Sequence, residues 1–138
     1  MNFKLSIIDT QRHIYDGEAV ELTIPALGGE MTVLAKHMSI VTPVGLGEVQ
    51  LKTPGKDISL TIGKGMFSME ENEATLLVED ASYTEELSEA AAEEAKKRAE
   101  ELIGKGIKGP DMEIAVSALR RSLLDLKVVR RRSLRNLS

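Results

Sequence analysis

The pattern of apolar residues changes within residues 74–103, which have the sequence ATLLVEDASYTEELSEAAAEEAKKRAEELI. Residues 74–78 carry apolar side chains at alternate positions, as in a β-strand with one buried face. From Ser82 onward the composition shifts to Ala, Glu and Lys, which favour helices. We therefore expect two domains, a β domain over residues 1–81 and a helical domain over residues 82–138.

The alternation extends back through residues 1–81, where short runs carry an apolar side chain at every second position. These side chains are Phe3, Leu5 and Ile7; Val20, Leu22 and Ile24; Val49 and Leu51; Ile58, Leu60 and Ile62; and Phe67 and Met69. Turn signals such as Asp16-Gly17 and Pro54-Gly55 separate the runs. Short strands at this spacing predict an antiparallel β-sandwich, because two packed sheets hide each other's apolar faces.

Residues 82–103 predict a first helix, capped either by Ser82 together with Glu85 or by Thr84 alone. Its apolar face consists mostly of alanine. The residues of this face are Leu87, Ala91, Ala95, Ala99 and Leu102. Small side chains let a second helix approach closely but bury little area, and burial contributes only about 25 cal/mol per Å². We expect a weak contact between helices.

Residues 104–110, GKGIKGP, end this helix because glycine and proline interrupt helical hydrogen bonding. Asp111 is expected to cap a second helix that runs to about Leu134. Apolar and small residues recur along it at helical spacing. They are Met112, Ala115, Leu119, Ser122, Leu126 and Val129. The short connection predicts an antiparallel two-helix hairpin that follows the sandwich.

The composition excludes several classes of protein. Of the 138 residues, 42% are hydrophobic and 29% are charged, as in soluble globular proteins. Aromatic residues make up only 3%, so we expect a core of Leu, Ile, Val, Met and Ala. The chain has no cysteine and two histidines, which argues against disulfides and histidine-rich metal sites. It has neither an apolar run long enough to span a bilayer nor a signal-peptide core.

The net charge of −4 is unevenly distributed. Residues 1–81 carry 6 Lys/Arg against 12 Asp/Glu. Residues 82–103 carry 3 against 7, whereas residues 111–138 carry 7 against 3. An acidic first helix followed by a basic second helix suggests two elements that attract each other or exchange partners.

No catalytic constellation stands out in the sequence. Gly63-Lys64-Gly65 is too short to cradle a phosphate and is interpreted as a turn. Nothing resembles a nucleophile elbow, although spacing alone does not exclude a Ser–His–Asp arrangement. His37 is interpreted as a surface or hydrogen-bonded turn residue.

A basic cluster, Arg130-Arg131-Arg132, lies near the end of the second helix with Lys127 and Arg135 close by. Three interpretations are open: nucleic-acid binding, cations at the negative end of a helix dipole, and contact with an acidic protein surface. The net acidity of the chain and its scarcity of aromatic residues argue against nucleic acid.

Five stretches together resemble the epsilon subunit family of F-type ATP synthases: residues 7–19, 25–37, 65–81, 95–101 and 126–129. The family's most recognisable segment is similar to Gly-Asp/Glu-Phe-Gly-Val-Leu-Pro-Gly-His. The matching positions are Glu30, Val33, Leu34 and His37, whereas Thr32, Ala35 and Lys36 replace Gly, Pro and Gly.

The resemblance implies a non-catalytic subunit of the proton-translocating ATP synthase, without catalytic residues or cofactors of its own. It would sit in the central stalk, peripheral to the cytoplasmic face of the bacterial membrane, and couple ion flow to ATP synthesis. Its partners would be the gamma subunit, the rotor ring of c subunits, and the alpha and beta subunits of the catalytic head. The mobile hairpin would extend into that head and inhibit ATP hydrolysis. The candidate partner contacts are Glu30, Met31, His37 and Met38 in the sandwich, and Lys127, Arg130, Arg131 and Arg132 in the second helix.

Some family members bind ATP through an Ile/Leu-Asp-x-x-Arg-Ala motif. The matching positions here are Leu87, Ser88, Ala91 and Ala92, so the acid and the arginine are lost. A further arginine of the second helix falls on Asp125, although Arg98 and Arg121 remain. Because a carboxylate opposes a phosphate ligand, weak or absent ATP binding is expected.

Two other functions compete with this interpretation. One is a stand-alone β-sandwich binding module whose basic helix contacts an acidic protein partner. The other is a small hydrolase that uses His37 with a nearby hydroxyl or carboxylate.

Overall fold

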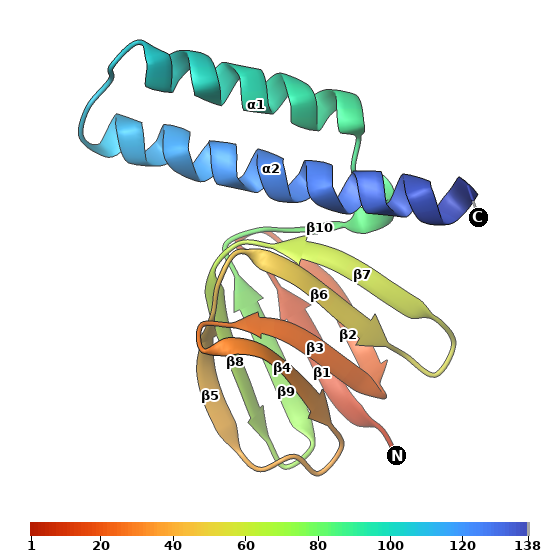
Figure 1. The fold of residues 1–138 in the computed structure, drawn as a ribbon. Helices are drawn as coiled ribbons and strands as arrows, with labels where there is room; N and C mark the ends of the chain where they lie inside the picture. Colours follow the sequence, from red (N-terminus) through yellow and green to blue (C-terminus); the bar gives the residue numbers. More distant parts are fainter. Residues whose placement is uncertain (138) are drawn as a thin grey trace. The chain divides into compact units, whose positions relative to one another are not determined.

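The computed structural model describes residues 1–137, which form two compact units. The first unit comprises Met1–Tyr83 and the second begins at Thr84. Strands make up the first unit and a pair of helices the second (Figure 1).

Within the described residues the first unit contains ten strands in one continuous hydrogen-bonded sheet. They are β1 (Phe3–Ile8), β2 (His13–Ala19), β3 (Glu21–Ala26), β4 (Gly29–Leu34), β5 (Ile40–Val44), β6 (Gly47–Lys52), β7 (Asp57–Ile62), β8 (Gly65–Glu70), β9 (Glu73–Val78) and β10 (Ala81–Tyr83). The order is β10-β7-β6-β3-β5-β8-β9-β1-β2, with β4 paired to β3.

The sheet folds over into two layers where β3 meets β5 through a single pair, Ala26 and Val44. Figure 1 shows β3, β6 and β7 lying across β1, β8 and β9. The predicted sandwich is therefore confirmed. Its pairs are antiparallel among the described strands with one exception, since β1 runs parallel to β9.

The sandwich core contains the apolar alternate positions expected from the sequence. Its largest fully buried side chains are Phe67, Leu5, Ile7, Leu22, Ile24, Leu51, Leu60, Ile62, Met69, Leu76, Val33 and Val44. The expectation of a core without aromatic residues was wrong, because Phe3 and Phe67 both lie in it. Each occupies an inward-facing position of its strand, so the same alternation that buries Met69 also buries Phe67.

The first helix begins later than predicted. Ser82 and Tyr83 pair with β7 as part of β10, and a 3-10 turn, η1 (Thr84–Glu86), follows. Helix α1 (Glu89–Gly104) is capped by Ser88, whose hydroxyl accepts a hydrogen bond from the Ala91 amide at 3.2 Å. The proposed caps at residues 82 and 84 are therefore wrong, since pairing with β7 keeps this segment extended.

The second helix, α2 (Pro110–Leu137), starts one residue before the predicted cap and runs past its predicted end. Proline suits the first helical position because its fixed φ fits a helix and its missing N–H would have no partner there. Asp111 lies inside the first turn instead of capping it. Gly109 precedes the helix with φ +68°, a value that glycine adopts without a steric cost.

The buried face of α1 differs slightly from the predicted one. Ala92 and Ala99 are buried, whereas Ala91 and Leu102 are exposed. The late start of the helix explains the error, because the predicted face counted from Leu87, which precedes α1. On α2 the predicted face is confirmed. Its buried members are Ala115, Ser122, Leu126 and Val129.

Gly65→Ala is expected to destabilise the sandwich by about 2–3 kcal/mol, because overpacking a close backbone contact forces the strands apart. A Cβ at Gly65 would lie 1.9 Å from the carbonyl oxygen of Leu77 on the neighbouring strand β9. Urea unfolding followed through the fluorescence of Tyr15 and Tyr83, both in the sandwich, measures the change.

Gly55→Ala is the matched control, since a Cβ there meets nothing within 4 Å. We expect its free energy of unfolding to change by less than about 0.5 kcal/mol. Equal unfolding midpoints for the two variants would contradict this account of the β8–β9 contact.

Candidate functional site

The two helices of the second unit contact each other through small and medium side chains. Helix α1 contributes Ala92 and Ala99, and α2 contributes its buried Ala, Ser, Leu and Val residues. The buried Ser122 hydroxyl donates to the carbonyl of Ala118 at 2.8 Å, so this polar group is satisfied within its own helix. Because alanine buries little apolar area, this contact stabilises the pair less than leucine pairs would.

Arg130 near the end of α2 forms ion pairs with the start of α1. Its Nε lies 3.2 Å from Glu89 Oε1, and its Nη2 lies 2.7 Å from Glu93 Oε1. Glu89 and Glu93 are one turn apart and therefore share a face of α1. The hydrogen bond that Arg130 donates to Glu89, with a contribution from Glu93, raises the pKa of Arg130. All three side chains are at least one-third exposed, so salt and water screen the attraction.

Arg132 extends the same contact to the turn before α1. Its guanidinium donates to the carbonyl oxygens of Thr84 and Leu87, the latter at 3.1 Å. Charge-assisted hydrogen bonds to carbonyls are stronger than neutral ones, and Arg132 is only partly exposed. We call Arg130 and Arg132, together with Glu89, Glu93 and the two carbonyls, the arginine clasp.

The structure divides the four candidate contact residues of α2 into two groups. Arg130 and Arg132 form the arginine clasp, whereas Lys127 and Arg131, which are exposed as Arg130 is, are not among the residues that define it. Sequence reasoning had missed Glu89 as the partner of Arg130. The signal was present in the spacing of Glu89 and Glu93, which places two carboxylates on one helix face.

The positions of the degenerate nucleotide motif have other structural roles. The Leu87 carbonyl accepts from Arg132, Ser88 caps α1, and Ala92 is buried. Arg121 Nε lies 3.3 Å from Asp125 Oδ1, with both side chains less than one-fifth exposed. Asp125 thus neutralises one of the two arginines that the motif retains.

The four candidate residues of the sandwich lie at opposite ends of β4. Glu30 and Met31 are near its start, where Glu30 is exposed and Met31 packs against the core. His37 and Met38 follow its end in the loop to β5, and Met38 is 81% exposed. The four candidate contact residues of the sandwich therefore form two groups, one at each end of β4.

The environment of His37 is that of a loop residue. Its amide donates to the Leu34 carbonyl at 3.2 Å, and its Nδ1 lies 2.8 Å from the Met38 carbonyl oxygen. A ring nitrogen bonded to a backbone carbonyl is not oriented by a carboxylate, as a catalytic base would be. This geometry gives no support to the hydrolase interpretation.

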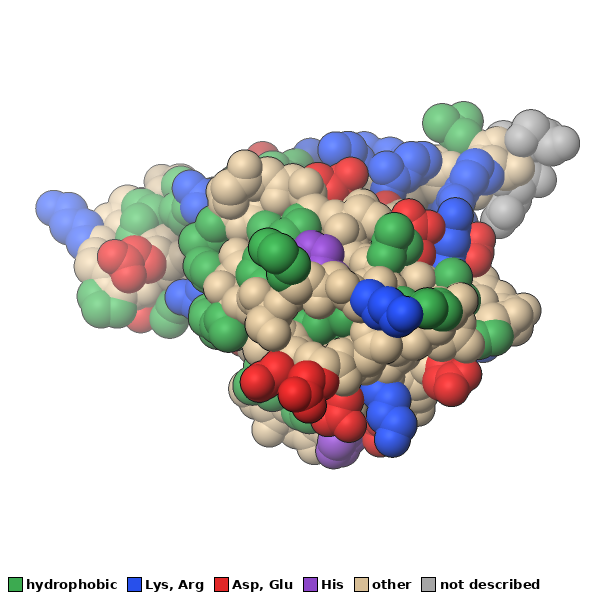
Figure 2. Space-filling view, turned by 90° about the horizontal axis from the view of Figure 1, so that it is seen from below, with side chains coloured by type: hydrophobic (Ala, Val, Ile, Leu, Met, Phe, Trp, Pro, Cys, Tyr) green, Lys and Arg blue, Asp and Glu red, His purple; other side chains and the backbone are tan. Residues whose placement is uncertain are grey.

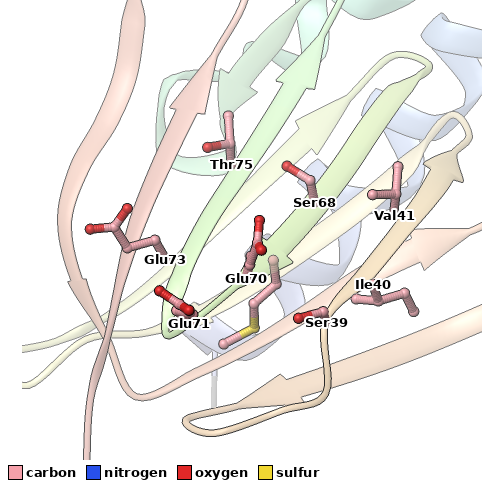
Figure 3. Close-up of a pocket in the computed structure, with 9 residues that line it drawn as sticks. Ser39, Ile40, Val41, Ser68, Glu70, Glu71, Glu73 and Thr75 are labelled. Carbon is pink, nitrogen blue, oxygen red and sulfur yellow. The ribbon is translucent and has the colours of Figure 1, made fainter.

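A shallow, open hollow of about 620 Å³ lies beside this loop (Figure 3). Its lining residues come from the β4–β5 loop, from strands β5, β8 and β9, and from the β8–β9 turn. They are Ser39, Ile40, Val41, Ser68, Met69, Glu70, Glu71, Glu73 and Thr75. Figure 2, a view of the molecule from below, shows hydrophobic side chains exposed beside a group of acidic ones. Such a mixed surface suits contact with a protein.

Within the described residues, no group of three His, Cys, Asp or Glu side chains is arranged to hold a metal ion. In the same part of the chain, no helix combines the length and the apolar composition needed to cross a bilayer.

Solved structures with a similar fold come from mitochondrial ATP synthases. A chain of the Euglena gracilis mitochondrial ATP synthase structure (OSCP/F1/c-ring) matches with a TM-score of 0.72 at 19% identity. The match covers 96% of this chain and 81% of that one. A chain of the Tetrahymena thermophila central stalk/c-ring structure matches with a TM-score of 0.62 at 10% identity, over 91% and 95% of the two chains. At these identities the similarity establishes the fold alone.

Sequence comparisons identify the protein family. The family model described as "ATP synthase, Delta/Epsilon chain, beta-sandwich domain" matches residues 2–84. The ATP synthase epsilon chain of Dehalococcoides mccartyi (strain BAV1) is 31% identical over 130 residues, covering 94% of this chain and 93% of the relative. That of Ruminiclostridium cellulolyticum is 31% identical over 130 residues, covering 94% and 97%. The chain therefore belongs to the epsilon-chain family of ATP synthases.

Proposed function

We propose that this chain is a non-catalytic rotor subunit in the central stalk of an F-type ATP synthase. It couples ion flow through the membrane rotor to ATP synthesis, and its C-terminal helices inhibit ATP hydrolysis. Membership of the epsilon-chain family supports the first part. The arginine clasp is the observation that supports the second, because it gives the hairpin a contact that a partner can replace.

The proposed partners are the gamma subunit, the ring of c subunits, and the alpha and beta subunits of the catalytic head. The chain would lie at the cytoplasmic face of the bacterial membrane and reach the bilayer only through the complex. The similarity to chains in structures of the F1/c-ring and central stalk/c-ring assemblies of mitochondrial ATP synthases supports this position. The exposed loop with His37 and Met38 supplies a contact surface on the sandwich.

The proposed inhibition depends on two conformations of the hairpin that differ little in free energy. In the closed conformation, Arg130 is paired with Glu89 and Glu93, and small residues pack between the helices. An acidic surface on the catalytic head would offer Arg130 equivalent carboxylates, while Lys127 and Arg131 would add new contacts. The partner then shifts the equilibrium by the difference between its affinities for the two conformations.

Deleting residues 84–138 is expected to relieve inhibition of ATP hydrolysis while the remaining sandwich still co-purifies with gamma. ATPase assays of the enzyme reconstituted with full-length and truncated chains measure the effect. Unchanged hydrolysis would contradict the inhibitory role, and failure of the full-length chain to co-elute with gamma would contradict membership of the stalk.

A point variant refines this experiment without removing the hairpin. Lys127→Glu should raise the concentration needed for half-maximal inhibition several-fold. The substitution replaces a cation that an acidic surface attracts with a carboxylate that this surface repels. Lys108→Glu makes the same charge change in the loop between the helices and should inhibit as the unmodified chain does. Equal effects of both variants would indicate that inhibition depends on the net charge of the chain instead of on a specific contact of Lys127.

We further propose that the chain alone binds ATP at its hairpin weakly or not at all, because Asp125 engages Arg121 and the motif lacks its acid and arginine. Isothermal titration should detect no saturable ATP binding to the full chain. The triple variant Ser88→Asp, Ala91→Arg, Asp125→Arg restores the family's motif and should gain measurable affinity. Tight, stoichiometric binding by the unmodified chain would overturn this proposal.

A further inference from the structure

The loop between β4 and β5 contains a residue in an unusual backbone conformation. Lys36 has φ +65°, in the left-handed region that residues with a Cβ rarely adopt. The loop carries the chain from β4, which pairs with β3, to β5, which pairs with β8 in the other layer. A left-handed lysine at this crossing requires a contact that holds it.

Asn72 supplies that contact from the turn between β8 and β9. Its Oδ1 accepts a hydrogen bond from the Lys36 amide at 2.6 Å, across 36 residues of sequence. Asn72 itself has φ +62°, which asparagine tolerates better than most residues. Its backbone carbonyl accepts from the Lys4 amide at 2.9 Å. A single side chain and its backbone thus join the start of β1, the β8–β9 turn and the β4–β5 loop.

After Lys36 come a half-buried His37 and an exposed Met38. The His37 amide donates a hydrogen bond to the Leu34 carbonyl, and the His37 ring contacts the Met38 carbonyl oxygen. The Met38 side chain is 81% exposed. Ser39 lines the hollow in Figure 3, as do Glu71 and Glu73, which flank Asn72. The Asn72–Lys36 hydrogen bond therefore ties the β4–β5 loop to the β8–β9 turn beside this hollow.

We propose that Asn72 is the positioning residue of the sandwich's protein-contact surface. Its Oδ1 holds Lys36 in the left-handed conformation, and this keeps His37 and Met38 in the orientation in which they meet the gamma subunit. The inference rests on the proposed function, in which gamma is a partner of this chain and this loop supplies a contact surface of the sandwich. Asn72 acts through Lys36, without itself touching the partner.

Glycine substitutions separate the hydrogen bond from the backbone conformations. Asn72→Gly preserves the left-handed turn, because glycine adopts φ +62° freely, but removes the acceptor. Asn72→Asp keeps an acceptor oxygen at the same distance from the backbone. Lys36→Gly removes the steric cost of the left-handed conformation, so it should restore the loop in the Asn72→Gly background.

The first measurement is amide exchange at Lys36 by NMR in the full-length chain. Asn72→Gly should raise the rate about fivefold, the factor that corresponds to one ordinary hydrogen bond. Asn72→Asp should match the unmodified chain. An unchanged rate in Asn72→Gly would overturn the inference. If Asn72→Gly does not fold, Asn72→Ser serves instead, because its shorter side chain does not reach the Lys36 amide.

The second measurement is the affinity of each variant for purified alpha-beta-gamma subcomplex lacking this chain. Asn72→Gly should bind about fivefold more weakly. The double variant Lys36→Gly, Asn72→Gly should recover the affinity of the unmodified chain. Full affinity of Asn72→Gly would overturn the inference, as would a double variant as weak as Asn72→Gly. Lack of binding by the unmodified chain would overturn the proposed function, whereas the exchange rates would still decide whether Asn72 holds the loop.

Discussion

The side chains that fill the space between the two layers of the sandwich are the constraint on which the first unit depends. Phe67, Leu22 and Leu60 are fully buried from three different strands, and each sits at an alternate position of its strand. Because this alternation commits one face of every strand to the core, the partner contacts are confined to outer faces and loops. The packed core thus supports a short loop, held by the hydrogen bond between Asn72 and Lys36, that presents His37 and Met38 in a fixed orientation.

The helical unit is held together differently. Ala92 and Ala99 bury little area, and the ion pairs of Arg130 are largely exposed to solvent. Arg132, bonded to two backbone carbonyls, adds a partly buried polar contact. Such an interface is strong enough to order two helices and weak enough to be exchanged for a partner, as the proposed inhibition requires.

The sequence predicted what depends on local periodicity. The strand alternation identified core positions such as Leu5 and Leu76, and helical spacing identified the buried face of α2. The start of α1 was missed because the pairing of Ser82 and Tyr83 with β7 is a tertiary contact. The Asn72–Lys36 contact joins residues 36 positions apart, so local pattern does not reveal it. For the Arg130–Glu89 contact, 41 positions apart, local spacing shows the paired carboxylates of α1 but not which arginine meets them.

Hydrogen exchange of the α1 amides tests the central claim that the hairpin is a weakly held, exchangeable element. It would be measured on the isolated chain at about 50 mM and about 500 mM salt, and on the assembled enzyme. We predict less protection in α1 than in the core strands, faster exchange at high salt because the arginine clasp is screened, and a changed pattern on assembly. Protection equal to that of the strands, unaffected by salt and by assembly, would contradict the account.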